Sequence, residues 1–325
     1  MKTRITELLE IHYPLILAPM TGTSTAPLAA AVSEAGGLGM IGTMAQGAGW
    51  LAQQVDEIRR ATERPFGIGF IQWVIDRQPE MWDEALKLRP HAISLSFGAP
   101  EVYIEKAKMA GIHVLYQAQT VELARRAAHA GADAVVAQGT EAGGHTGSVS
   151  TLPLVPAVVD AIHPVPVIAA GGIADGRGIA AALMLGAEGV WMGTRFVASA
   201  EALAHANAKR RIVEAHADET VLTHVYDIVQ GGLWPDEFAG RAIQNRFTDR
   251  WHGREDELRL SLEIEGAAVA AAQADGNIAL APLYAGESSG LIGELLQAGQ
   301  IVRDLFDDAE AILRRRPGIL LGESG

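Results

Sequence analysis

One pattern of polar and apolar positions recurs along the first part of the chain. A helix-like stretch ends in glycine and a short apolar run follows, as in "SEAGGLGMIG" (33–42), "AKMAGIHVLYQ" (107–117), "AHAGADAVVAQ" (128–138) and "LMLGAEGVWMG" (183–193). Glycine is the residue that a left-handed helix C-cap favours. A continuous apolar run is typical of a strand buried on both faces of a parallel sheet. The pattern therefore predicts alternating helices and buried parallel strands.

Runs of this kind predict eight strands, at 14–18, 38–42, 66–71, 92–97, 112–117, 133–138, 166–170 and 189–192. Amphipathic stretches such as 49–61 and 120–130 separate them. Eight βα units of this length predict an α/β fold, the closed (β/α)₈ or TIM barrel. A doubly wound open sheet is the alternative, but its G-x-G-x-x-G signature is missing after the first strand, where residues 19–27 read "PMTGTSTAP".

The alternation of helix-like stretches and short apolar runs ends at about residue 200. Residues 201–284 read as helical, with a turn-rich patch at 229–240, and predict a small helical subdomain inserted near the C-terminus. The barrel is then expected to span 1–200 and to be completed by a returning segment, 285–325, whose helices lie against the barrel wall.

Composition narrows the class of protein. The chain has 325 residues, of which 49% are hydrophobic and 20% charged, and it has no cysteine, so it is expected to be a packed globular protein without disulfides or thiol chemistry. A net charge of −13 argues against a nucleic-acid partner. Without a long apolar run or a signal-peptide core, we expect no membrane span and a cytoplasmic location.

Two glycine-rich loops predict a phosphate site. "AAGGIADGRG" (169–178) follows the seventh predicted strand and "MGTRF" (192–196) the eighth. Barrels commonly bind phosphate there, with exposed backbone N–H groups as donors. Arg177 and Arg195 either add charge to this site or form structural ion pairs. From the residues alone, a nucleotide, a sugar phosphate and flavin mononucleotide (FMN) all stay open as ligands.

The loop "AQGTEAGGHTG" (137–147) places His145 among glycines, with few side chains expected around it. An imidazole can accept or donate a proton near neutral pH, so His145 is the candidate catalytic residue; a surface histidine is the other interpretation. Glu141 either orients this imidazole or anchors the loop through backbone amides. No metal site is predicted, because no ligand constellation has the required spacing.

In this order, "APMTG", "PFGIGF", "QGTEAGGHTG", "PVIAAGGIADGRG", "LGAEGVWMGTRF" and "YAGESSGLI" resemble the nitronate monooxygenase family, formerly 2-nitropropane dioxygenases. The resemblance covers about residues 5–200 and 284–294. It implies a flavoprotein oxidoreductase with FMN across the top of a TIM barrel. The implied reaction is the oxidation of nitroalkanes or nitronates by O₂ to a carbonyl compound and nitrite.

The resemblance also implies site residues. His145 corresponds to the family's catalytic histidine and acts as the base on a neutral nitroalkane, and Gly286 matches a segment near the substrate. The implied cofactor contacts are Pro19, Met20, Gln138, Gly143, Gly171, Gly172, Met192, Gly193 and Thr194. The partners implied are a small-molecule substrate and O₂; assembly into a homo-oligomer stays open.

Three positions depart from the family pattern. Gly69 stands where an asparagine is usual, with Gln72 as its candidate substitute; Thr146 replaces a basic residue, and Trp191 replaces a glutamine. The same motifs occur in FMN-dependent enoyl-ACP reductases and the same barrel in NADH:quinone reductases, so an NAD(P)H-dependent flavin reductase is the alternative. A barrel that binds a phosphate ligand without redox chemistry is a third hypothesis.

Overall fold

The computed structural model describes residues 1–44, 46–232 and 234–322. Eight parallel strands follow the order β1-β9-β8-β6-β5-β4-β3-β2. A parallel bridge between Ile16 and Leu38 joins the first and last strands of this order and closes the barrel. The strands are β1 (Leu15–Leu17), β2 (Gly39–Gly42), β3 (Phe66–Ile71), β4 (Ala92–Ser96), β5 (His113–Ala118), β6 (Ala134–Gln138), β8 (Val167–Ala170) and β9 (Gly189–Met192). The predicted TIM barrel and its eight strands are confirmed.

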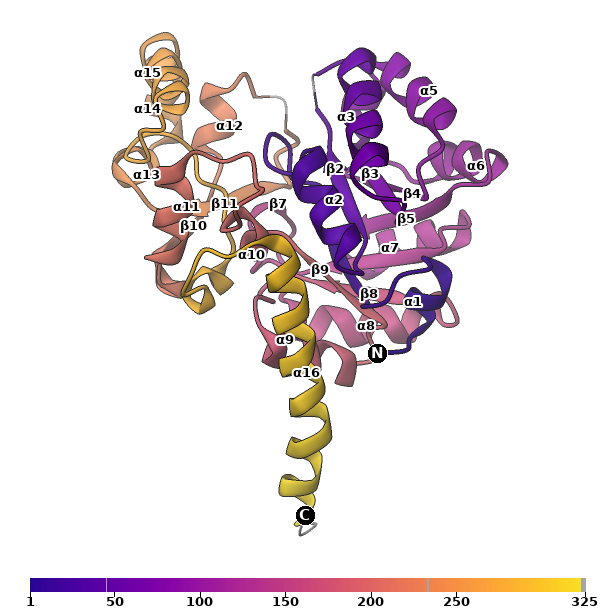
Figure 1. The fold of residues 1–325 in the computed structure, drawn as a ribbon. Coiled ribbons are helices and arrows are strands. Elements are labelled where there is room, and N and C mark those ends of the chain that lie inside the picture. Colours follow the sequence, from indigo (N-terminus) through magenta and orange to yellow (C-terminus); the bar gives the residue numbers. More distant parts are fainter. Residues whose placement is uncertain (45, 233, 323–325) are drawn as a thin grey trace.

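Helices alternate with these strands and form the outer wall (Figure 1). The helices of the barrel are α1 (Arg4–Leu8), α2 (Ala26–Glu34), α3 (Ala48–Ala61), α4 (Gln72–Ile75), α5 (Pro79–Leu88), α6 (Glu101–Met109), α7 (Val121–His129), α8 (Thr151–Ile162), α9 (Gly176–Met184), α10 (Thr194–Val197) and α16 (Ala298–Leu321).

Glycine turns connect helices to strands as the sequence pattern predicts. Gly36, Gly111, Gly131 and Gly186 follow α2, α6, α7 and α9 with φ of +100°, +73°, +95° and +94°. After each glycine, the next N–H donates to the carbonyl five residues earlier, at 3.0–3.2 Å, as in a Schellman cap. These turns keep the connections short, so each strand re-enters the barrel directly after its helix.

The barrel interior is a packed apolar core. Ile16, Leu115, Ile168 and Trp191 are among the side chains that fill it, and Ile5 from α1 joins them. The opposite faces of the strands pack against the surrounding helices in a second, larger core. Burying one such side chain stabilises the fold by roughly 1.5–3 kcal/mol. This rigid scaffold fixes the positions of the loops that follow the strands.

The segment 201–284 lies beside the barrel in Figure 1 and contains strands as well as the expected helices. Strands β10 (Thr220–Thr223), β11 (Ala239–Ile243) and β7 (Gly144–Thr146) form an antiparallel sheet in the order β10-β11-β7. Because β7 comes from the loop after β6, this sheet attaches the segment to the barrel. The other elements of this segment are α11 (Ala206–Val213), η1 (Ala217–Glu219), α12 (Val225–Val229), α13 (Arg246–Trp251), α14 (Glu255–Leu260) and α15 (Leu262–Ala274), and η2 (Glu287–Leu291) follows it.

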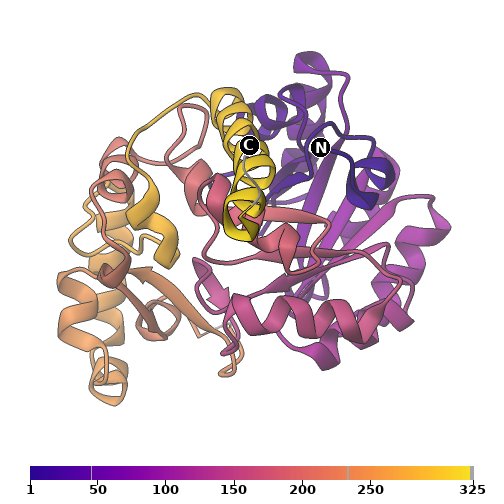
Figure 2. The same cartoon turned by 90° about the horizontal axis from the view of Figure 1, so that it is seen from below.

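The chain ends with the long helix α16, which packs its first half against α9 and α2. Its apolar face buries Ile301, Leu305 and Phe306. The second half extends past the barrel toward the C-terminus in Figure 1, and the view from below in Figure 2 looks nearly along this helix. Over the described part of the chain, no helix combines the length and apolar character that crossing a bilayer requires.

Candidate active site

A cavity of about 590 Å³ lies at the carboxyl ends of the barrel strands. Residues from the segments that end or follow β1, β6, β8 and β9 contribute much of its lining, among them 18–23, 141–145, 170–173, Trp191, Gly193 and Thr194. The segment 278–288 contributes another wall. Its size is that of a pocket for a cofactor or a small molecule. The cavity therefore occupies the face where TIM barrels carry their active sites.

Most of the site residues that the sequence predicts line this cavity. Those that line it are Pro19, Met20, Gln138, Gly143, His145, Gly171, Gly172, Gly193, Thr194 and Gly286. Met192 is not among the lining residues. It is 1% exposed in the barrel wall, where its carbonyl accepts the N–H of Ala18 at 2.9 Å. At this end of β9, a contact with a ligand would therefore come from a neighbour of Met192 and not from Met192 itself.

The predicted phosphate rim is a left-handed glycine turn at Gly171 and Gly172, called the nest below. Gly171 and Gly172 have φ of +101° and +71°. A side chain at Gly171 would place its Cβ 2.9 Å from the carbonyl oxygen of Gly139 and 2.8 Å from the hydroxyl of Thr151. Only glycine meets both the conformation and this close approach. Successive N–H groups in such a turn converge on an anion.

Neither candidate arginine contributes charge to this rim. Arg177 forms an ion pair with Asp175, and Asp175 in turn caps the N-terminus of α9. Arg195 is buried and donates to the carbonyl of Glu294 at 3.2 Å, and burial lowers the pKa of its guanidinium. Among the described residues that line the cavity there is no Lys or Arg. An anion at this rim would therefore depend on N–H and hydroxyl donors.

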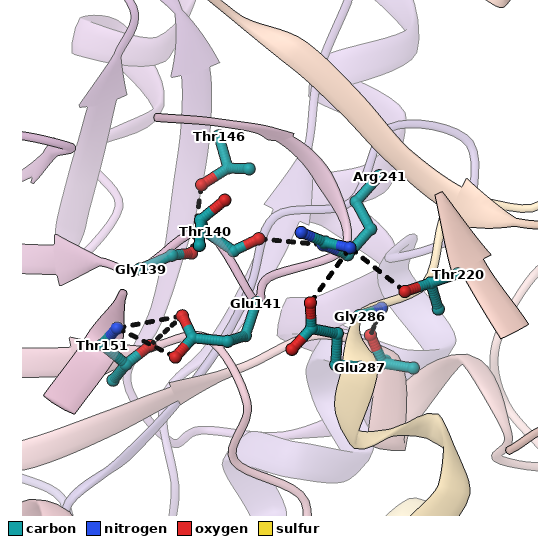
Figure 3. A network of polar contacts seen from close by, with 10 residues as sticks. Gly139, Thr140, Glu141, Thr146, Thr151, Thr220, Arg241, Gly286 and Glu287 are labelled. Atoms are coloured by element: carbon teal, nitrogen blue, oxygen red, sulfur yellow. Dashed lines mark hydrogen bonds and ion pairs between the residues drawn. The ribbon is translucent and has the colours of Figure 1, made fainter. Parts of the chain in front are cut away.

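The loop after β6 is held by the network drawn in Figure 3. Glu141 accepts from the Thr151 N–H at 2.9 Å and from its hydroxyl at 2.8 Å. Arg241 on β11 donates to the carbonyl of Thr140 at 2.9 Å and pairs with Glu287 at 3.1 Å. Glu141 thus anchors the loop, as one of its two predicted roles requires, and it does not orient His145.

His145 is 8% exposed, so the expectation of few surrounding side chains is wrong. It lies in β7, paired with Gly240 of β11. Its Nε2 is 2.8 Å from Oδ1 of Asp227, and the indole of Trp234 stacks on the ring with centroids 3.5 Å apart and planes 8° from parallel. Sequence reasoning missed both partners, because each lies more than 80 residues away in the chain and no local pattern marks it.

Gln138 links this histidine to the barrel wall. Its side-chain N–H donates to the carbonyl of His145 at 3.1 Å. Its Oε1 accepts from Gln117 and Gln119, each at 2.9 Å. These side chains are buried, and the three hydrogen bonds of Gln138 fix the orientation of its amide. The network therefore holds the backbone of β7 in one position relative to β6.

Close packing accounts for one departure from the family pattern. A Cβ at Gly69 would lie 2.2 Å from Cβ and Cγ of Pro19, so the ring of Pro19 takes the space that a side chain would need. Gln72 is buried in α4, packs against Gly98 and is not among the lining residues, so it does not substitute for an asparagine there. Trp191 belongs to both the interior core and the cavity lining and forms part of its floor.

Fold and site together define a class of protein, a barrel oxidoreductase of the flavin-dependent kind. The chain belongs to the nitronate monooxygenase family, whose sequence model matches residues 2–84 and 78–308.

Individual relatives agree with this assignment. A probable nitronate monooxygenase of Staphylococcus saprophyticus is 32% identical, covering 97% of this chain and 99% of the relative. One from Staphylococcus aureus strain JH9 is 34% identical, covering 88% and 92%.

Two solved structures are similar over nearly the whole chain. FabK from Thermotoga maritima has a TM-score of 0.88 at 36% identity and covers 98% of this chain and 99% of its own. Nitroalkane oxidase from Streptomyces ansochromogenes has a TM-score of 0.83 at 30% identity and covers 96% and 99%.

Proposed function

We propose that this protein oxidises nitronates and nitroalkanes with O₂, giving a carbonyl compound and nitrite, with FMN as its cofactor. The observation that carries the proposal is the meeting of a glycine nest and a buried histidine in one cavity of a nitronate monooxygenase family member. The nest suits a phosphate, and the histidine suits proton removal from an acidic C–H.

The cavity fits FMN in size and donor chemistry. Gly171, Gly172, Gly193 and Thr194 would hold the phosphate through N–H and hydroxyl groups at one rim. Pro19, Met20, Gln138 and Gly143 would flank the ring system, and the cavity volume of about 590 Å³ leaves room for a small substrate beside it. When bound, FMN would supply the oxidation and the reaction with O₂.

The side chains of the protein remove the proton, exclude water and shape the space for the substrate. The imidazole of His145 takes the α-proton of a neutral nitroalkane, which leaves the nitronate anion in the cavity. Trp234 covers the flat face of that imidazole and keeps water from it. Gly286 lies opposite the loop after β6. A Cβ at this position would lie 2.5 Å from the carbonyl oxygen of Glu141, so only glycine fits. This wall therefore has no side chain at position 286 facing the substrate.

A second function is supported by the structural similarity to FabK, the higher of the two TM-scores above. In this alternative the enzyme is an NAD(P)H-dependent flavin reductase, of the enoyl-ACP reductase or quinone reductase type. The loops of the barrel would then accept a nicotinamide in place of a nitronate.

Anaerobic mixing of the purified flavoprotein separates these functions. We expect the flavin absorbance to bleach on addition of ethyl nitronate or propyl nitronate and to persist with NADH or NADPH. Rapid bleaching by either nicotinamide, with none by the nitronates, would establish the reductase and overturn the first proposal.

A further inference from the structure

Asp227 of α12 lies between two histidines. Its Oδ1 is 2.8 Å from Nε2 of the buried His145, and its Oδ2 is 3.5 Å from Nδ1 of His224. The carboxylate side chain is 7% exposed, whereas that of His224 is 37% exposed. The three side chains thus form a continuous line from the cavity to the surface.

The carboxylate of Asp227 loses its hydration on burial, and hydrogen bonds from its surroundings do not fully replace that hydration. Its Oδ2 has no hydrogen-bond partner among the described residues. The neighbouring Tyr284, buried against the other side of His145, has a hydroxyl that is likewise unpaired within those residues. Burial raises the pKa of Tyr284, and the charge of Asp227 raises it further, so this phenol stays neutral. A half-satisfied buried carboxylate calls for a functional reason.

We propose that Asp227 is the positioning residue of His145, with His224 beside its other oxygen; the inference rests on the proposed function. An ionised carboxylate only accepts hydrogen bonds, so Asp227 fixes the ring hydrogen on Nε2 and leaves Nδ1 as the basic nitrogen. The same charge stabilises the imidazolium that forms when the ring accepts a proton.

The proton then has a defined route. The substrate C–H bond breaks, its electron pair stays on the nitronate, and the proton joins Nδ1 of His145. The Nε2 hydrogen stays on the ring and donates to the Asp227 carboxylate, so the added proton makes an imidazolium, and Nδ1 later releases that proton to water and becomes basic again. No electron moves in these steps. The ionisable groups around Asp227 are His224 and Tyr226 on its own helix, His145 on β7 and Tyr284 from the segment before η2.

The tautomer of His145 is the direct test, and it needs neither substrate nor turnover. In protein with isotope-labelled histidine, with His145→Gln used to assign the resonances, we expect NMR to show the neutral ring protonated on Nε2. A neutral ring protonated on Nδ1 in the wild-type protein overturns the proposal. Asp227→Leu replaces the carboxylate by an apolar side chain that cannot accept a hydrogen bond and is expected to populate the Nδ1–H form; an unchanged tautomer contradicts the positioning role.

Kinetics test the consequence for catalysis. We expect Asp227→Leu to lower kcat for neutral nitroethane by about 10²-fold or more, with little change in KM and a much smaller effect on preformed ethyl nitronate. Equal losses with nitroethane and with ethyl nitronate would show a general structural defect and overturn the positioning role.

The two proposals can fail separately. If the flavin bleaches with NAD(P)H and not with nitronates, the proposed function fails, while the Nε2–H tautomer and its dependence on Asp227 still hold. If nitronates are oxidised but the tautomer is Nδ1–H, only the role of Asp227 fails.

Discussion

His145 acquires its environment from parts of the chain that meet only in the folded protein. Its backbone belongs to a loop of the barrel, its Nε2 faces Asp227, and its ring faces Trp234. The position is buried, and the aromatic and carboxylate partners restrict the ring to one orientation. A general base needs such a fixed geometry more than it needs any particular neighbour in sequence.

Replacing His145 by alanine should separate the two substrate classes. We expect the variant to lose about 10²–10⁴-fold in turnover of neutral nitroalkanes, because the base is gone. Preformed nitronates should be affected less, since their proton has already left. Steady-state oxygen consumption with nitroethane and with ethyl nitronate measures both. Unchanged turnover of nitroethane would exclude His145 as the base.

Gly69 is a second residue whose identity is set by a distant neighbour. Gly69→Ala would force the ring of Pro19 to move, because the new Cβ would lie 2.2 Å from it. Overpacking of this kind costs about 1–3 kcal/mol of unfolding free energy, and flavin retention should also fall because Pro19 lines the cavity.

Gly49→Ala is the matched control, since a Cβ at this position of α3 meets no described neighbour within 4 Å. Alanine in a helix should leave stability unchanged or raise it by up to about 1 kcal/mol. Denaturant unfolding compares the two variants. Equal unfolding midpoints would show that the ring of Pro19 moves aside without loss of stability.

At the scale of elements, α9 starts beside the nest and depends on its cap. The Asp175 side chain accepts from the backbone N–H groups of Arg177 and Gly178. Burial acts to raise the pKa of this carboxyl, but the bonds from Arg177 and Gly178 outweigh it, and the net pKa is lowered. A group with a lowered folded pKa stabilises the protein fully above its unfolded pKa, and this contribution is lost as pH falls through the folded value.

Asp175→Ala should therefore lower the unfolding free energy by about 1 kcal/mol at neutral pH. The difference from wild type should shrink once the pH falls below the unfolded aspartate pKa of about 3.9. Asp175→Asn keeps a capping oxygen and should cost less at neutral pH. Urea unfolding at pH 7 and at pH 3.5 measures this. A difference that stays constant across that range would show that the charge of Asp175 does not contribute.

The barrel elements follow from sequence because their signals are local. The run 112–117 predicts β5, observed at His113–Ala118, and the glycine at 131 marks the turn before β6 in both sequence and structure. Strand β7 had no such signal, because "GHT" has no strand periodicity and pairs with β11, more than 90 residues later. Ten of the predicted site residues line the cavity for the same local reason, whereas sequence reasoning did not point to Asp227 or Trp234.

At the scale of the whole molecule, the cavity is built by two parts of the chain. The barrel supplies the nest and the loop of His145, while the segment 201–284 supplies Trp234 to the lining and Asp227 as the partner of His145. The sheet formed by β7, β11 and β10 fastens one part to the other. Any ligand that fills the cavity contacts both, so binding is expected to stabilise the assembled protein as a unit.

FMN should therefore raise the melting temperature of flavin-free protein, and riboflavin should raise it less. At a free FMN concentration near 100 times its Kd, the stabilisation is about 2.7 kcal/mol. Riboflavin lacks the phosphate that the N–H groups of the nest would bind, so it should bind more weakly. Because no Lys or Arg is present among the described residues of the lining, salt should change the FMN affinity only weakly.

Thermal unfolding with each flavin at 50 mM and 500 mM salt checks these expectations together. Equal shifts with FMN and riboflavin would mean that the nest around Gly171 and Gly172 does not bind the phosphate. A steep loss of FMN affinity at high salt would instead assign the phosphate to a cationic side chain outside this lining. A large shift with FMN that riboflavin does not match and salt does not reduce is the result that neutral donors at the rim require.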